Sequence, residues 1–175
     1  MKRRIAEQSQ HKSILEILCF DKDYSVRVAV GSNKHSSLFV FKKLYRDQSD
    51  EVRYSVARNP VCPHVILEKL SRDNHSNIRE AVALNENSNE TILRRLSKDH
   101  QWWIREKVAY HSNCPDDLLL DLINDSHEAV VEAVLKSIFL NKLYLLNFLV
   151  KRNHSVVLKF LKDNRRMIMR SLDTH

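Results

Sequence analysis

The sequence has very few of the residues that make sharp turns. Its 175 residues include one glycine and three prolines. Hairpins and flexible linkers depend on these residues. Their scarcity predicts an all-α chain that forms a single domain over residues 1–175.

Cysteine is also scarce, and no recognisable catalytic or metal-binding motif is present. The three cysteines, Cys19, Cys62 and Cys114, are odd in number and far apart. This favours a reduced compartment over a disulfide framework, so we expect a cytoplasmic protein. No Cys, His and Asp set has metal-ligand spacing, and the sequence lacks a nucleophile elbow, a phosphate-binding glycine loop and HExxH. We expect no enzyme activity, metal or cofactor.

Long apolar runs are missing as well. The most apolar stretch, residues 138–150, is interrupted by Asn141, Lys142 and Asn147. It is too short and too polar to span a bilayer. The first ten residues, MKRRIAEQSQ, contain no apolar segment of a signal peptide. We therefore expect no membrane span.

The sequence does contain a repeat with a period of 26 residues. An aspartate recurs in one phase and an arginine recurs six residues after it. The aspartates are Asp21, Asp47, Asp73, Asp99 and Asp125, and the arginines are Arg27, Arg53, Arg79 and Arg105. Apolar residues recur in step with them. A fixed period of this length is typical of a solenoid, in which each unit buries its apolar face against its neighbours.

Each unit reads as two short helices. The first follows the phased aspartate, has apolar residues four apart, and ends at Asn33, Asn59, Asn85 or, in the fourth unit, His111. We expect the asparagines to end it in the left-handed conformation. The second begins near Ser37, Pro63, Asn89 or Pro115. The pattern predicts a right-handed α-solenoid of about six two-helix repeats.

The expected units follow the period. A half-repeat cap at 11–20 precedes repeats at 21–46, 47–72, 73–98, 99–124 and 125–150, and a basic C-terminal cap occupies 151–175. The fifth unit departs from the pattern, since Val131 replaces the arginine and Ser137 the asparagine. It predicts either a longer helix or a rearranged turn.

The unit D-x4-[VI]-R-x2-[VS]-A-x-N-x-x-[CS]-P-x2-[IL]-L-x2-L resembles HEAT-like repeats. It is most similar to the leucine-rich repeat variant (LRV), and the resemblance covers roughly residues 11–150. The resemblance implies a curved, armadillo-like superhelix and no particular activity. The cysteine-bound iron–sulfur cluster of one such protein type is not implied, because the necessary cysteines are absent.

The Asp and Arg series admits two interpretations. The arginines could form a ladder that grips phosphates or carboxylates. Alternatively, aspartate binds backbone amides at the helix start while arginine binds the Asp or carbonyls of a neighbouring unit. Recurrence in consecutive copies is what stacking requires, so we favour the structural role.

Candidate partner-binding residues lie where the units differ. Trp102 and Trp103 occupy phases that are mostly polar in the other units, and could anchor a protein or stack on bases. The alternative is that one of them fills a gap in the packing, and we expect at least one ring to be partly exposed. Tyr54, Arg58 and Tyr110 lie in two other variable phases.

Basic charge is concentrated at the two ends. The net charge is +7, of which residues 1–12 contribute +3 and residues 140–175 contribute +6, leaving −2 for the repeats. The candidate anion contacts are Lys159, Lys162, Arg165 and Arg166. The alternative is that these residues form the solvated face of a cap helix.

We expect a non-enzymatic scaffold that binds another macromolecule, with a protein as the favoured partner, through a concave face. Which phase lines that face is open, as is the oligomeric state. The alternative is a nucleic-acid-binding protein. Asp99, Trp102, Trp103 and Arg105 resemble elements of the HEAT-like alkylpurine DNA glycosylases, although Asp99 and Arg105 are also ordinary members of the phased series.

Overall fold

A computed structural model describes residues 1–141, 143–151 and 154–163. Within these ranges all regular structure is helical, in thirteen helices. The odd-numbered helices up to α11 are α1 (Lys2–Gln8), α3 (Tyr24–Ser32), α5 (Asp50–Arg58), α7 (Ser76–Ala83), α9 (Trp102–Tyr110) and α11 (Glu128–Asn141). Between them lie α2 (Lys12–Leu18), α4 (Leu38–Leu44), α6 (His64–Leu70), α8 (Glu90–Leu96) and α10 (Asp116–Leu122). Helices α12 (Leu143–Lys151) and α13 (Ser155–Asp163) follow.

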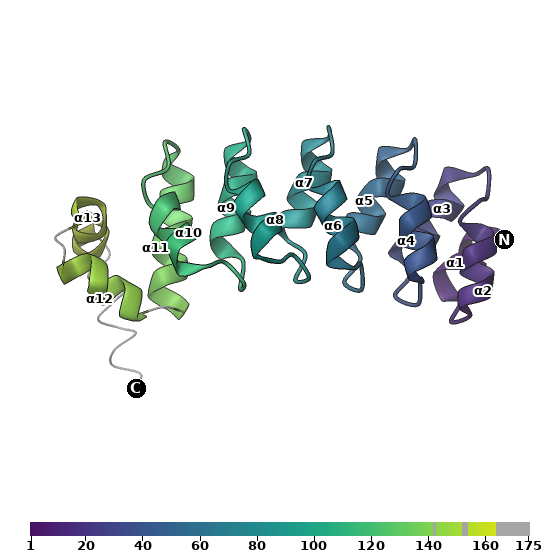
Figure 1. Cartoon of the computed structure of the whole chain (residues 1–175), viewed down its shortest axis with the longest axis horizontal. Coiled ribbons are helices and arrows are strands. Elements are labelled where there is room, and N and C mark those ends of the chain that lie inside the picture. Colours follow the sequence, from purple (N-terminus) through teal and green to yellow (C-terminus); the bar gives the residue numbers. More distant parts are fainter. Residues whose placement is uncertain (142, 152–153, 164–175) are drawn as a thin grey trace.

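The helices are arranged in an elongated row of successive pairs (Figure 1). Each odd-numbered helix from α1 to α9 packs against the next odd-numbered one, and these contacts are more extensive than those between even-numbered helices. The all-helical prediction is therefore confirmed for the described residues. Helices of seven to nine residues are unstable alone in water, so packing between pairs must stabilise them.

The core runs along the row between the two series of helices. It is built from the phased apolar residues, each of which contributes roughly 1.5–3 kcal/mol when fully buried. On the odd-numbered helices the buried residues include Val26, Val30, Val52, Val56, Ile78, Val82, Ile104, Val108, Val130 and Val134. On the even-numbered helices they include Val40, Phe41, Leu44, Ile66, Leu67, Leu70, Ile92, Leu93, Leu96, Leu118, Leu119 and Leu122.

The predicted helix starts are confirmed. The second helices follow Ser37, Pro63, Asn89 and Pro115, which are their N-cap residues. The first helices begin three residues after the phased aspartate. Each of these aspartates accepts a hydrogen bond from the backbone N–H two residues later, as Asp47 does from Ser49 at 3.0 Å. The aspartate thereby fixes the turn that leads into the helix.

The two ends of the row differ from the central pairs. Helix α1 packs against α3 and buries Ala6 completely, and the repeat pattern did not predict it. In the fifth unit, α11 has 14 residues, so the longer-helix alternative is confirmed. Helix α13 lies within the expected cap at 151–175 and begins at Ser155.

Candidate functional site

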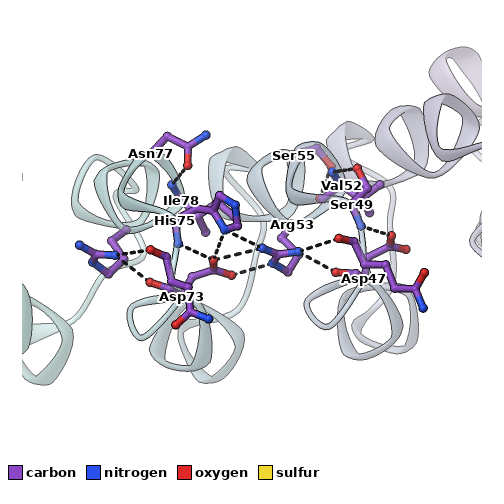
Figure 2. Close-up of polar contacts among 12 residues, drawn as sticks. Asp47, Ser49, Val52, Arg53, Ser55, Asp73, His75, Asn77 and Ile78 are labelled. Carbon is purple, nitrogen blue, oxygen red and sulfur yellow. Dashed lines mark hydrogen bonds and ion pairs between the residues drawn. The ribbon is translucent and has the colours of Figure 1, made fainter.

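The phased arginines connect consecutive units. The guanidinium of Arg53 lies between Asp47 of its own unit and Asp73 of the next (Figure 2). Its Nε donates to Asp73 Oδ2 at 2.7 Å, and its Nη1 donates to the backbone carbonyl of Asp47 at 2.8 Å. Arg27, Arg79 and Arg105 make the equivalent contacts with Asp47, Asp99 and Asp125. These arginines are engaged within the protein.

The same contacts set the charge state of the aspartates. Burial alone would raise the pKa of Asp73, but hydrogen bonds from Arg53 and from the His75 amide outweigh it and hold the pKa below its usual value. For Asp125 the hydrogen bond from Arg105 is the largest effect and lowers the pKa. These aspartates are therefore ionised at neutral pH and bonded to arginine.

The phased asparagines form a second connection between units, which the sequence did not reveal. Asn85 Nδ2 donates to the carbonyls of Ala57 at 2.7 Å and Asn59 at 2.9 Å, both in the preceding unit. Its Oδ1 accepts from the Asn87 amide at 3.0 Å. Since Asn85 is buried, these bonds satisfy groups that water cannot reach.

The expected left-handed conformation is wrong for Asn33 and Asn59. Asn33 and Asn59 have φ of −74° and −70° and extended backbones. Asparagine suits this position because its side-chain amide can donate to the preceding unit and accept within its own unit. His111 substitutes for it in the fourth unit, with Nδ1 accepting from the Asn113 amide and Nε2 placed 3.0 Å from the carbonyl of Asn85. That pairing assigns the ring proton to Nε2.

Asp99 has the same environment as the other phased aspartates. It accepts from Arg79 at 2.6 and 3.0 Å and from the Gln101 amide at 3.0 Å. Arg105 is likewise bonded to Asp125. The positions of Asp99 and Arg105 are therefore those that the repeat sets, and both carboxylate oxygens of Asp99 accept hydrogen bonds.

The two tryptophans contact one another and the next unit. Trp102 stacks on His127, with ring centroids 4.0 Å apart and planes 3° apart. Trp103 meets the edge of Trp102 at 5.9 Å. Both side chains are half-buried and pack against the core. Trp102 thus fills a gap between two units, while both rings keep part of their surface in solvent.

The other predicted partner-binding residues lie on one face of the odd-numbered helices. Tyr54 is half-buried, and its hydroxyl lies 3.5 Å from Arg58 Nη1 on the exposed surface of α5. Tyr110, at the end of α9, is 45% exposed. Leu84, which stands in the same phase as Arg58 and Tyr110, directly follows α7 and is 57% exposed. It is the most exposed apolar side chain of that phase.

The basic C-terminal residues are only partly described. Lys159 and Lys162 lie on α13 and are exposed, whereas Arg165 and Arg166 fall outside the described residues. Lys159 also lines a surface pocket of about 380 Å³ between α11 and α13, together with Asp125, Glu128 and Phe160.

The cysteines and acidic residues form no metal centre in the described part of the chain. All three cysteines are buried, and burial raises the pKa of Cys62 to about 12. No group of three His, Cys, Asp or Glu side chains suited to a metal ion lies within the described ranges. Among the helices that the structure places, none has the length and apolar character needed to cross a bilayer.

Comparison with known proteins adds no relative. No protein-family model matches the chain, and no curated protein matches it. The site must therefore be interpreted from its own geometry.

Proposed function

We propose that the chain is a non-enzymatic helical-repeat scaffold that binds another protein. We assign it to the HEAT-like repeats, as a right-handed solenoid of about six units of the LRV type, and place it in the cytoplasm. Like other solenoids, it would use an extended surface made from equivalent positions of successive units. The proposal depends on which positions are constant and which vary.

One row of variable, solvent-facing positions carries the proposal. The same phase, which lies at or just after the ends of α3, α5, α7 and α9 and inside α11, holds residues of different chemistry. This row, the variable row, consists of Ser32, Arg58, Leu84, Tyr110 and Lys136. Arginine and tyrosine are enriched at the centres of protein interfaces, and Leu84 supplies exposed apolar area beside them.

The polar positions that are constant from unit to unit support the same distinction between residues that build the stack and residues that face a partner. The phased arginines, aspartates and asparagines bond to neighbouring units, so they build the stack and are not available to a partner. Among the described residues, the side-chain contacts of the variable row, such as Arg58 with Tyr54 and Lys136 with Glu132, stay within one unit. A surface whose supporting residues recur while its exposed residues differ is suited to recognising one particular partner.

We place the variable row on the concave side. The odd-numbered helices pack against one another more extensively than the even-numbered helices do. In a curved stack, the helices on the inner side are closest together. The variable row then lines the inner side, where a partner can contact several units at once.

Capture of a partner by the full chain tests this function. The immobilised wild type is compared with a Leu84→Asp/Tyr110→Asp variant and a Val65→Asp control, since Val65 on α6 is 45% exposed, like Tyr110. Circular dichroism checks that all three are folded. We expect a partner retained by the wild type and the control and lost by the double variant. A partner retained equally by all three would contradict the assignment of the surface.

A further inference from the structure

Six exposed cations occupy two phases of three consecutive units on the other series of helices. In each unit one lies in the last turn of the even-numbered helix, and a second lies two residues beyond its end. We call this set the cation ladder. Its members are Lys43, Arg46, Lys69, Arg72, Arg95 and Lys98.

The units place these cations at regular intervals. Helices α4, α6 and α8 follow one another along the row (Figure 1). Packed helices are about 8–10 Å apart, so the ladder advances by roughly that distance per unit. A cation is favourable near the C-terminus of a helix. The helices do not require one there, because α10 forms with Asp121 and Asn124 at the same two phases.

The ladder is poorly neutralised by the protein. Within the described part of the chain, Arg72 is the one member in an ion pair, with Glu68 at 3.8 Å. Lys43 and Arg46 lie over the rings of Phe20 and Tyr45. The phased aspartates that follow each helix are bonded to the phased arginines, as described for Asp73 and Arg53. The ladder therefore keeps an uncompensated positive field.

A groove and two aromatic rings adjoin the first pair of cations. Lys43 and Arg46 line a groove of about 430 Å³ with Lys22 and Phe20. The carboxylates in this groove, Asp21 and Asp47, are bonded to Lys2 and Arg27. Phe20 and Phe39 lie with ring centroids 6.1 Å apart and are more than half exposed. Such rings are able to stack on unpaired bases.

We infer that the cation ladder binds a single-stranded nucleic acid, with the cations on its phosphates and Phe20 and Phe39 on its bases. A single-stranded nucleic acid would use both the cations and the aromatic rings, whereas an interface with an acidic protein would need an apolar centre. One turn before the cations, the exposed residues are Phe39, Val65 and Thr91, so the apolar surface beside the ladder does not continue to α8, and lysine is depleted in protein interfaces. This surface belongs to the even-numbered helices, so the inference does not rest on the proposed protein-binding role of the variable row.

Fluorescence anisotropy of the full chain with labelled oligonucleotides tests the ladder. A mixed-sequence single strand of about 20 nucleotides is titrated between about 50 and about 200 mM salt. Six phosphate contacts predict a log–log slope of about −4, which is a loss of affinity of roughly 300-fold over that range. A Lys69→Ala/Arg95→Ala variant should reduce the slope by about 1.4.

Control variants separate this site from other basic residues. Arg94→Ala and Lys107→Ala remove cations that are already in ion pairs and should leave binding unchanged. Phe39→Ala should weaken binding of the single strand more than binding of a duplex. Lys159→Ala/Lys162→Ala measures the contribution of α13.

Several results would overturn the inference. One is the absence of binding at the lowest salt concentration. Another is binding that persists in the Lys69→Ala/Arg95→Ala variant but is lost on changing Lys159 and Lys162, which would place the site on α13. Equal competition by polyglutamate and by the oligonucleotide would assign the ladder to an acidic protein. Partner capture through Leu84 and Tyr110 is measured separately, so failure of one proposal does not affect the other.

Discussion

Arg79 and Asp99 are twenty residues apart and bonded through two parallel hydrogen bonds of 2.6 and 3.0 Å. Arg79 also donates to the backbone carbonyl of Asp73 in its own unit at 2.8 Å. One guanidinium thus joins the loop of one unit to the loop of the next. The series stops where both partners change, since Val131 replaces the arginine and Lys151 stands where the next aspartate would be.

Loss of Arg79 should destabilise the stack. The side chains of Arg79 and Asp99 are 16% and 6% exposed, so Arg79→Ala leaves a largely buried carboxylate unpaired. We expect a loss of about 2–3 kcal/mol of unfolding free energy in urea titrations. The double variant Arg79→Ala/Asp99→Asn should lose less than the sum of the single variants. The control is Arg94→Ala, whose ion pair with Asp117 is exposed and should leave the urea midpoint nearly unchanged. Equal losses in the two arginine variants would show that burial of the pair is unimportant.

Stability should fall in acid because of the same carboxylates. The folded-state pKa of Asp99 lies below 3.8, so its ion pair stabilises the fold fully above that pH. The contribution is lost as the pH falls through the lower folded-state pKa, since the unfolded state takes up the proton first. Urea unfolding of the wild type and Asp99→Asn between about pH 6 and about pH 2 measures this. The variant should show a shallower decline below pH 3.8, and parallel curves would contradict the predicted linkage.

Replacing Asn85 by its near-isosteric acid should be costly. In Asn85→Asp the donor to Ala57 and Asn59 is lost and a carboxylate faces two carbonyl oxygens. We expect a loss of about 3 kcal/mol at neutral pH, measured by thermal or urea unfolding. His111→Asn is the matched control, because asparagine supplies the same donor and acceptor, and it should change stability by less than about 1 kcal/mol. A tolerant Asn85→Asp variant would mean that these amide bonds contribute little.

Gly31 and Ser55 should behave as a coupled pair. Gly31 occupies the phase of Ala57, Ala83 and Ala109, and a Cβ atom there would clash with Ser55 Oγ. Gly31→Ala alone should therefore destabilise the protein. Adding Ser55→Ala should restore stability and exceed the wild type by up to about 1 kcal/mol, because alanine is the better helix former. Additive effects of the two substitutions in a double-mutant cycle would contradict the coupling.

Much of the helical pattern could be predicted because each unit repeats its local signals. The apolar phases, the starts of the second helices and the longer α11 follow from residues within one unit. The role of Asn85 could not be predicted, because its hydrogen-bond partners Ala57 and Asn59 belong to another unit. The residues next to Asn85 in the sequence give no indication of these partners. An argument limited to helix ends therefore predicted a left-handed conformation for the asparagine series, which is wrong for Asn33 and Asn59.

The candidate binding surfaces could also be predicted only in part, because they depend on contacts between units. Trp102 was identified as irregular, yet its stacking on His127 depends on how two units meet. The cation ladder was missed because the net charge of the repeats is slightly negative. A sum over residues counts Asp73 and Asp99 equally with Lys69 and Arg95. In the structure the aspartates are bonded to arginines, while Lys69 and Arg95 are exposed.

Site-specific photo-crosslinking tests the central claim most directly, namely that the variable row binds a protein. A photoreactive amino acid is placed at Leu84 in one variant and at Val65 in another, both exposed and on different series of helices. We predict a protein crosslinked from position 84 in cells, absent from position 65, and lost when Tyr110→Asp is added. The same protein crosslinked from position 65 and not from position 84 would contradict the account.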